Sequence, residues 1–275
     1  MNHLLGRLDG LGVTALAMLK AADLYEHFTK PGLKVCSLPS TRRFLGYLHD
    51  EGVIPADLSV CVPKIRIPRP LPSIYTRDEI SRVLAAVDRS TAIGRRDYAI
   101  LMLASKLGLR SSDITNLSIG NIDRESATIS IIQKKTSRPL KLVLNPDVKE
   151  TLDAYIDDGR PASSSDKVFL RHKAPFEPLR AGTCFEVAFR YFEEANIAPS
   201  GRRRGPHALR ASYATSLINK GVPYSVVKEA LGHDDPESIK HYARVDIRRL
   251  RTCALDVPMP TGSFAIMIGD LEGRL

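Results

Sequence analysis

The stretch RRDYAILMLASKLGLRSSDITNL, residues 95–117 of this 275-residue chain, predicts the centre of the fold. Its first part is apolar over much of a helical surface and ends at Gly108, a residue typical of helix ends. A helix that is apolar on most sides is covered by other elements, so we expect this one to lie in the middle of a domain. The segment SSDITNL then starts a second, short helix.

The flanking segments predict mainly α structure with a small antiparallel sheet. TRDEISRVLAAVD, residues 76–88, opens with Thr76 and Glu79 in the capping-box arrangement. ATISIIQKKTSRPLKLVL, residues 127–144, has two β-branched or aliphatic runs around a polar turn, which indicates a β-hairpin. NPDVKETLDAYI, residues 145–156, and most of the chain after it are predicted to be helical.

A proline-dense stretch, CVPKIRIPRPLPSIYT, divides the chain. Proline lacks an N–H, fixes its own φ and restricts its predecessor, so neither a long helix nor a central strand can cross it. We therefore predict two domains and a linker. The ranges are a short helical domain at 1–62, a Pro-rich linker at 63–75, an α-rich domain at 76–255 and a C-terminal tail at 256–275.

The charge of the chain indicates a polyanionic partner. The formal net charge is +9, which attracts nucleic acid or an anionic membrane surface. No apolar run reaches the roughly 20 residues of a membrane span, and Arg7 and Asp9 interrupt the N-terminal apolar segment. A signal peptide is therefore not indicated, and a cytoplasmic location without membrane contact is expected.

Cofactor motifs are not found in the sequence. The four cysteines are scattered with no C-x-x-C pair, so neither a zinc site nor a disulfide framework is indicated. There is also no G-x-x-x-x-G-K-[ST] loop and no dinucleotide fingerprint. We expect a protein that uses neither a metal nor a nucleotide cofactor.

Four short stretches carry side chains that suit phosphoryl transfer: GLRSSD with Arg110, IIQKKTSRP with Lys135, GPHALRASYAT with His207 and Arg210, and LGHDDPESIKHYARVD with His233 and Tyr242. Each alone is a weak signal, because such residues recur by chance in basic chains. Together, two arginines match the non-bridging oxygens of a phosphodiester, and a turn lysine can protonate a leaving oxygen. The phenol of Tyr242 is the candidate nucleophile.

Each of these residues also has a structural interpretation. A tyrosine on a helix is more often a core residue, and a histidine beside a turn is often held by local hydrogen bonds. An arginine at a helix end can interact with the helix dipole, and most turn lysines are only solvated.

The candidate residues follow one another along the chain in the order Arg110, Lys135, the H-A-L-R of residues 207–210, the L-G-H of residues 231–233 and Tyr242. This ordered set resembles that of the tyrosine recombinase (phage integrase) family. The resemblance covers roughly residues 76–250. It implies a two-domain architecture, with a small helical DNA-binding domain of the core-binding kind and an α-rich catalytic domain. It also implies a site-specific recombinase or integrase that acts on double-stranded DNA, as a tetramer, through a 3′-phosphotyrosyl intermediate and without ATP or metal.

The resemblance implies a role for each residue. Tyr242 would attack the scissile phosphate and leave a 3′-phosphotyrosyl link with a free 5′-hydroxyl. Lys135 would be the acid for the 5′ oxygen, and His207 would assist proton transfer to and from the tyrosine. The side chains that would stabilise the pentacoordinate state are Arg110, Arg210 and His233.

Three further features bear on the resemblance. Asp113 matches an acidic position that in the family supports the active site from behind. The block before the linker is shorter than the usual four-helix core-binding domain. The tail holds an apolar stretch, residues 264–268, that would dock on a neighbouring protomer or pack on its own domain.

Three alternatives remain open from the sequence. The first two share the fold: a catalytically silent DNA-binding protein, and a relaxing enzyme like the type IB topoisomerases, which acts as a monomer. The third is a metal-dependent nuclease, although adjacent acids before Pro236 are typical of a helix cap. Its ligands would be His233, Asp234, Asp235 and His241.

Overall fold

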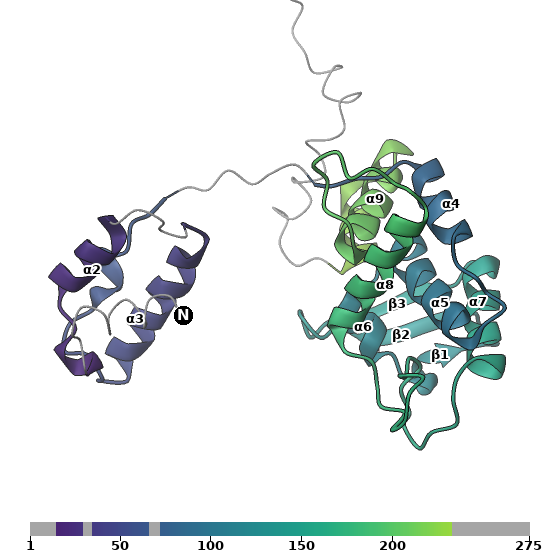
Figure 1. Ribbon diagram of the computed structural model, residues 1–275, viewed down its shortest axis with the longest axis horizontal. Coiled ribbons are helices and arrows are strands. Elements are labelled where there is room, and N and C mark those ends of the chain that lie inside the picture. Colours follow the sequence, from purple (N-terminus) through teal and green to yellow (C-terminus); the bar gives the residue numbers. More distant parts are fainter. Residues whose placement is uncertain (1–14, 30–34, 66–71, 233–275) are drawn as a thin grey trace, which may run out of the picture. The chain divides into compact units, whose positions relative to one another are not determined.

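The computed structural model describes residues 15–29, 35–65 and 72–232 (Figure 1). The chain divides into two compact units, Met1–Pro70 and Leu71–Leu275. The division falls inside the predicted linker. Helices predominate and one small antiparallel sheet is present, as predicted.

The first unit is helical, with a core of leucine and isoleucine. Its longer helices are α2 (Ala21–Thr29) and α3 (Leu38–Asp50), and its 3-10 helices are Leu16–Met18, Val35–Ser37 and Leu58–Cys61. Leu24, Leu45 and Ile54 are fully buried between these elements. The guanidinium of Arg42 on α3 donates to the carbonyl of Val62, which fixes the chain as it leaves the unit.

The second unit is built around α5, which runs through its middle (Figure 1). The helices are α4 (Arg77–Ala85), α5 (Ala92–Lys106), α6 (Ser111–Asn116), α7 (Pro146–Asp158), α8 (Ala181–Glu194), α9 (Pro206–Asn219) and α10 (Tyr224–Leu231). Helices α4, α6, α7, α8 and α9 all contact α5, which confirms the predicted central helix. The capping box of α4 is also confirmed. Within the described ranges, no helix is both long and apolar enough to cross a membrane.

The sheet has three antiparallel strands in the order β1-β2-β3. They are β1 (Ile122–Asp123), β2 (Thr128–Ile132) and β3 (Pro139–Val143), and a 3-10 helix at Ile119–Asn121 precedes them. The predicted hairpin is confirmed, with Ile131 opposite Leu140. The strand β1 was not predicted, because two residues are too few to show alternation.

The chain enters the second unit through a buried residue that sequence analysis assigned to the linker. Tyr75 is 6% exposed, and its N–H donates to the Ser212 hydroxyl at 2.8 Å. Its ring packs against Phe192, with ring centres 4.5 Å apart, and the Arg202 guanidinium covers the ring at 4.1 Å. Arg202 also donates to the Glu79 carboxylate at 2.7 Å. These contacts fix α4 to the loop that precedes α9.

A buried carboxylate joins α5 to α8. The Asp97 side chain is fully buried and accepts a hydrogen bond from the Arg96 guanidinium at 2.9 Å. A second guanidinium, that of Arg190 on α8, pairs with the other oxygen of Asp97, and the Tyr191 hydroxyl lies 3.4 Å from it. A buried charge is stable only when it is paired and hydrogen-bonded in this way.

Asp97→Ala is expected to destabilise the second unit by about 3–5 kcal/mol, because it leaves the mostly buried Arg96 without its carboxylate. The matched control is Asp157→Ala, which removes an exposed ion pair with Arg124 and costs only about 0–1 kcal/mol. Urea unfolding of both variants measures the difference. Equal losses in the two variants would contradict a structural role for the buried pair.

Candidate active site

Four of the six predicted catalytic residues lie in the described part of the chain: Arg110, Lys135, His207 and Arg210. They come from the start of α6, the turn between β2 and β3, and α9. The structure brings them together, because Arg110 and Arg210 both donate to carbonyls at the end of α10, and the positive charges of Arg110, Arg210 and Lys135 all lower the pKa of His207. The two outside the described residues are His233 and Tyr242.

A glycine allows the elements of the site to approach closely. Gly108 ends α5 with a φ of +63°, a conformation that favours glycine. A Cβ atom at this position would come within 2.8 Å of side-chain atoms of Leu231 and of Tyr213. The connection from α5 to α6 can therefore pass directly beside α9 and α10.

Arg210 is buried and held by backbone carbonyls. It is 4% exposed, and its Nη1 donates to the carbonyl of Gly108. Its Nη2 donates to the carbonyl of Leu231 at 2.7 Å, at the C-terminal end of α10. Carbonyl oxygens are neutral acceptors, so these two bonds orient the guanidinium without cancelling its charge.

Arg110 reaches the same end of α10. Its Nη2 donates to the carbonyl of Gly232 at 3.0 Å, and its Nη1 lies 3.8 Å from a carboxylate oxygen of Asp113. That Nη1 is buried and has no hydrogen-bond acceptor among the residues that the structure describes. The Asp113 carboxylate therefore offsets part of the charge of Arg110 on the buried side of the guanidinium.

Asp113 connects Arg110 to the hairpin turn. One carboxylate oxygen faces the arginine, and the other accepts the N–H of Lys134 at 3.0 Å. The side chain is almost completely buried. Asp113 therefore contacts two parts of the candidate site from the protein interior.

Lys135 is exposed in the β2–β3 turn. The turn is closed by two backbone bonds, from Gln133 N–H to the carbonyl of Arg138 at 2.9 Å and from Ser137 N–H back to Gln133 at 2.8 Å. The ammonium of Lys135 forms no hydrogen bond or ion pair with any described residue. It can therefore extend towards a ligand without breaking a contact.

His207 is on the first turn of α9 and has a pKa below the 6.5 of a free imidazole. The main cause is that the protein beside the ring removes part of its hydration, although the residue is exposed overall. The positive charges of Arg210, Lys135 and Arg110 lower the pKa further. The imidazole is therefore neutral near pH 7 and can accept a proton.

One residue of the site was not singled out by sequence analysis. Gln133 is fully buried, and its Nε2 donates to the carbonyl of Leu231 at 3.3 Å. Strand alternation puts this position on the inner face, where an apolar residue is expected. A polar residue at an inward position was the signal that could have identified it.

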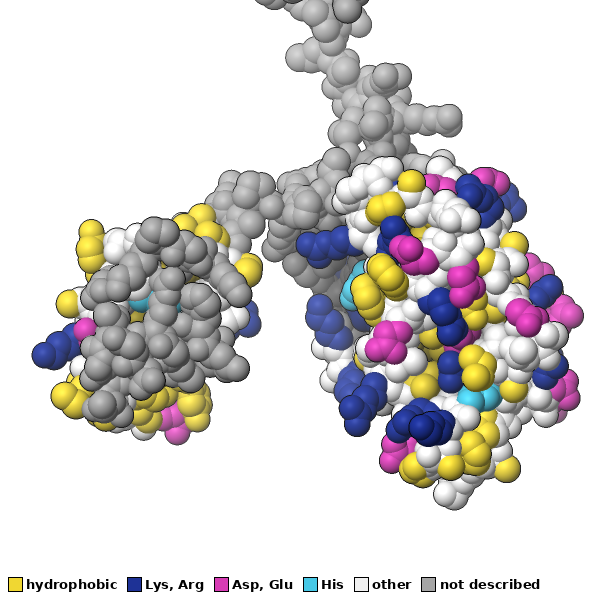
Figure 2. Space-filling view, in the orientation of Figure 1, with side chains coloured by type: hydrophobic (Ala, Val, Ile, Leu, Met, Phe, Trp, Pro, Cys, Tyr) yellow, Lys and Arg dark blue, Asp and Glu magenta, His cyan; other side chains and the backbone are white. Residues whose placement is uncertain are grey.

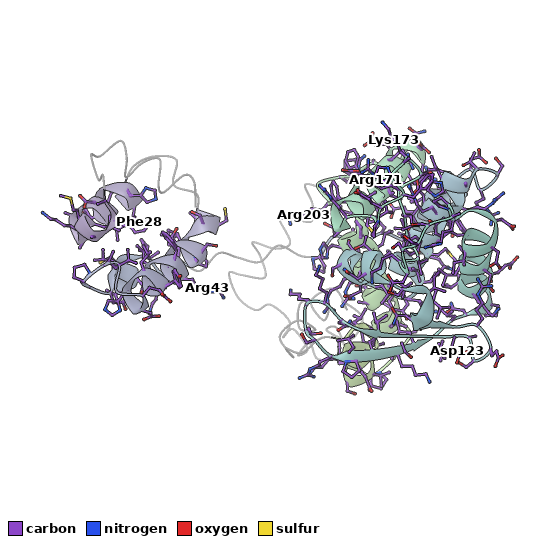
Figure 3. All side chains as sticks on the ribbon, turned by 90° about the horizontal axis from the view of Figure 1, so that it is seen from below. Phe28, Arg43, Asp123, Arg171, Lys173 and Arg203 are labelled. Atoms are coloured by element: carbon purple, nitrogen blue, oxygen red, sulfur yellow. The ribbon has the colours of Figure 1, made fainter. Side chains whose placement is uncertain are left out.

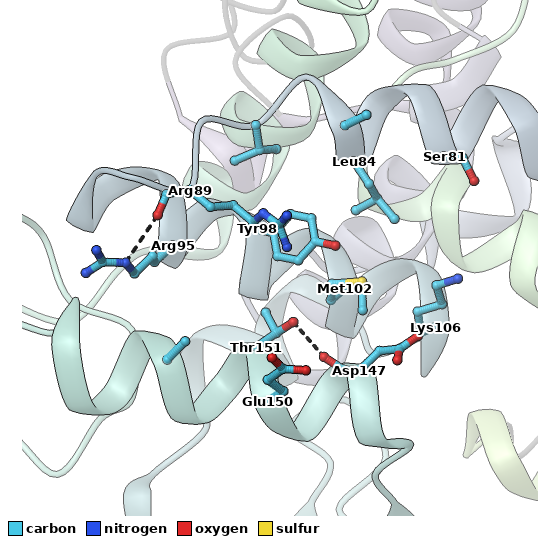
Figure 4. Close-up of a pocket in the computed structure, with 13 residues that line it drawn as sticks. Ser81, Leu84, Arg89, Arg95, Tyr98, Met102, Lys106, Asp147, Glu150 and Thr151 are labelled. Atoms are coloured by element: carbon cyan, nitrogen blue, oxygen red, sulfur yellow. Dashed lines mark hydrogen bonds between the residues drawn. The ribbon is translucent and has the colours of Figure 1, made fainter.

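The candidate site is separate from a pocket on the same unit. A pocket of about 760 Å³ opens between α4, α5 and α7, lined by residues that include Arg89, Tyr98, Met102 and Asp147 (Figure 4). None of the four described candidate residues lines it. The pocket therefore supplies no side chain to the positively charged cluster.

Metal ligation receives no support from the described residues. They contain no group of three or more His, Cys, Asp or Glu placed to hold a metal ion, and Cys36, Cys61 and Cys184 are free thiols. The ligands suggested for a metal-dependent nuclease, residues 233–235 and His241, lie outside the described residues.

The surface of the second unit suits a polyanion. Figure 2 shows Lys and Arg side chains along the left-hand edge of this unit, with few acidic side chains among them.

Residues 74–249 match the phage integrase family. The chain belongs to this family, the tyrosine recombinases. The predicted family and the predicted enzyme class, a tyrosine-type site-specific recombinase, are confirmed.

Curated relatives and solved structures agree with this assignment. An integrase/recombinase of Sinorhizobium fredii, y4gC, is 37% identical over 189 residues, or 68% of this chain and 97% of the relative. Tyrosine recombinase XerC of Lactobacillus delbrueckii subsp. bulgaricus is 26% identical over 83% of this chain and 79% of that protein.

The solved structures confirm the fold. The Tn1549 transposon integrase in complex with transposon right end DNA gives a TM-score of 0.64 at 19% identity, covering 91% of this chain and 92% of that one. A lambda integrase dimer bound to a core site gives 0.62 at 17% identity, covering 87% and 86%.

The charge cluster predicts that Lys135→Ala raises the pKa of His207, because loss of a nearby positive charge makes protonation of the imidazole easier. NMR titration of the labelled histidine measures this shift. The control is Lys134→Ala, which removes the neighbouring lysine and is expected to leave the pKa unchanged. An unaltered pKa in the Lys135 variant would mean that the hairpin turn does not approach α9.

Proposed function

We propose that this tyrosine recombinase breaks and rejoins DNA strands at specific sites through a covalent 3′-phosphotyrosyl intermediate on Tyr242. The main support is that Arg110, Arg210 and Lys135, from three separate elements, put their positive charges beside His207, with both arginines bonded to carbonyls at the end of α10. A phosphodiester in transfer has developing negative charge and a leaving oxygen that needs a proton, and this cluster can meet both needs.

Each bond that forms in the reaction replaces a bond that breaks, so the reaction needs no separate energy source. The phenol oxygen of Tyr242 forms a bond to phosphorus while the bond from phosphorus to the 5′ oxygen breaks. Neutral His207 takes the proton of the phenol, and Lys135 gives a proton to the departing 5′ oxygen. One phosphodiester replaces another, so a free 5′-hydroxyl can reverse the reaction without ATP.

The two arginines would hold the non-bridging oxygens, with His233 as a third donor. Their guanidinium groups are already oriented by the carbonyls of Leu231 and Gly232, so little reorganisation is needed when the phosphate binds. Preorganised donors of this kind act where charge develops, and the loss of one typically costs a factor of roughly 10²–10³ in rate.

DNA affinity would come from other cations. In the loop before α9, Arg202 pairs with Glu79 and Arg204 pairs with Glu193. Arg203 lies between them, is exposed at the edge of the unit (Figure 3) and forms no side-chain hydrogen bond or ion pair with the described residues. We assign it a contact with the phosphate backbone.

The arrangement of the arginines favours an enzyme over a catalytically silent DNA-binding protein. Phosphate contacts that supply affinity alone are made by exposed lysines and arginines. A buried guanidinium such as that of Arg210 carries a desolvation cost that backbone binding does not require. Recombination between two DNA sites, rather than relaxation of one duplex, would separate the proposal from a monomeric relaxing enzyme.

The proposed partner is double-stranded DNA, bound by a homo-oligomer with four protomers. The Tn1549 integrase structure is titled as a complex with transposon right end DNA, and the lambda integrase structure as a dimer bound to a core site. Strand exchange between two duplexes involves four strand ends, so four copies of one active site would suffice.

Tyr242→Phe is expected to abolish covalent attachment to a nicked suicide duplex while DNA binding stays largely intact. Denaturing gel electrophoresis of the protein–DNA adduct measures attachment, on DNA taken from beside the coding region. The control is Tyr213→Phe on α9, which should keep the adduct. An adduct formed by the Tyr242 variant would mean that the nucleophile is another residue, and strand cleavage without an adduct that is lost in excess EDTA would favour the metal-dependent nuclease.

Arg210→Lys is expected to impair the cleavage rate, and Arg203→Ala is expected to impair DNA affinity. The first keeps the charge but loses the rigid fork, so cleavage falls by roughly 10²–10³ while affinity changes little. The second weakens DNA binding and makes the slope of log K against log salt concentration less steep, by the amount expected for about one phosphate contact. Cleavage at saturating DNA concentration should change little. Cleavage rates at saturating DNA and binding isotherms at several salt concentrations separate the two. A purely affinity defect in the Arg210 variant would refute the clamp role.

A further inference from the structure

A buried glutamine links the hairpin turn to the end of α10. The Gln133 side chain leaves the end of β2, and its Nε2 donates to the carbonyl of Leu231. Its Oε1 accepts the hydroxyl of Thr136 at 2.9 Å, so both ends of the amide are bonded. Removal of either partner would leave a buried polar group unsatisfied.

The glutamine and the glycine after α10 fit one another. Gly232 ends the helix with a φ of +61°, and a Cβ atom built on it would overlap the amide of Gln133. The amide therefore packs directly against the backbone of the residue that precedes His233. Arg210 shares the same Leu231 carbonyl, so the amide and the guanidinium converge on one atom.

The same residue closes the turn that carries Lys135. Its backbone N–H and carbonyl form the bonds across the turn with Arg138 and Ser137, and its side chain holds Thr136, the neighbour of the lysine. Both the backbone and the side chain of Gln133 therefore restrict the position of this turn relative to α10.

We infer that Gln133 is a positioning residue, which places Lys135 against the phosphate by tying the hairpin turn to the C-terminal end of α10. The inference rests on the proposed function, in which Lys135 protonates the 5′ oxygen. Gln133 touches neither substrate nor reacting atoms and acts through the lysine. A shift of about 1 Å in such a group can cost a factor of roughly 10² in rate.

The test changes the leaving group of the cleavage reaction from oxygen to sulfur. In DNA with sulfur in place of the bridging 5′ oxygen, the tyrosine oxygen bonds to phosphorus and the phosphorus–sulfur bond breaks. A thiolate departs without a proton, because a thiol ionises near pH 8.5, as in cysteine, whereas an alcohol does not. A variant that impairs only proton donation is therefore rescued by sulfur, and a variant that impairs the fold or the phosphate clamp is not.

The variant is Gln133→Met in the full chain, which keeps length and approximate volume but loses both hydrogen bonds. On oxygen DNA we expect cleavage to fall by roughly 10–10², less than the roughly 10²–10⁴ that a general acid contributes, because the lysine is displaced and not removed. On sulfur DNA we expect it to match the unmodified protein within about threefold. Thr136→Val removes only the bond to Oε1, and a smaller defect with the same rescue is expected even if the Met variant folds poorly.

Two controls make the outcomes distinct. Leu152→Ala truncates a fully buried residue of α7, which is not part of the turn, and any loss of activity should be equal on both substrates. Lys135→Ala should be rescued by sulfur. If it is not, the proposed role of the lysine fails and the inference fails with it. If the lysine variant is rescued but Gln133→Met is unimpaired, or equally impaired on both substrates, the inference alone is overturned.

Discussion

The C-terminal end of α10 holds the candidate site together, because its last carbonyl oxygens accept side chains from three other elements. Leu231 receives Arg210 from α9 and Gln133 from β2, and Gly232 receives Arg110 from the start of α6. The carbonyls at a helix C-terminus carry about half a negative charge, so they attract guanidinium groups. Half a charge orients these groups but does not by itself neutralise them.

The arginines of the second unit differ in the groups that accept their hydrogen bonds. Arg96 and Arg190 share the carboxylate of Asp97, and Arg202 binds that of Glu79. Those carboxylates offset the charge of the arginines and join α5 to α8 and α4 to the loop before α9. At the candidate site the guanidinium of Arg210 is bonded to carbonyls instead. The same residue type therefore joins helices through carboxylates in the core and binds backbone carbonyls at the candidate site.

Elements with strong local signals can be predicted from the sequence. The capping box at Thr76, the apolar helix before Gly108 and the hairpin were all confirmed, because caps and periodicity act within a few residues. The strand β1 shows no such signal, and the proline-dense stretch predicts that Tyr75 belongs to the linker. The position of Tyr75 depends on Phe192 and Arg202, more than 100 residues further along the chain, and no local pattern contains such information.

The sequence by itself determined the family, since residue types in a fixed order along the chain suffice for a family resemblance, and it predicts which residues carry the chemistry. Only the tertiary structure decided how Arg110 and Arg210 are oriented, and that Gln133 belongs to their surroundings. The physical reason is that their acceptors are backbone carbonyls, which every residue possesses. A carbonyl leaves no mark in the sequence, so its position at the end of α10 becomes known only when the chain is folded.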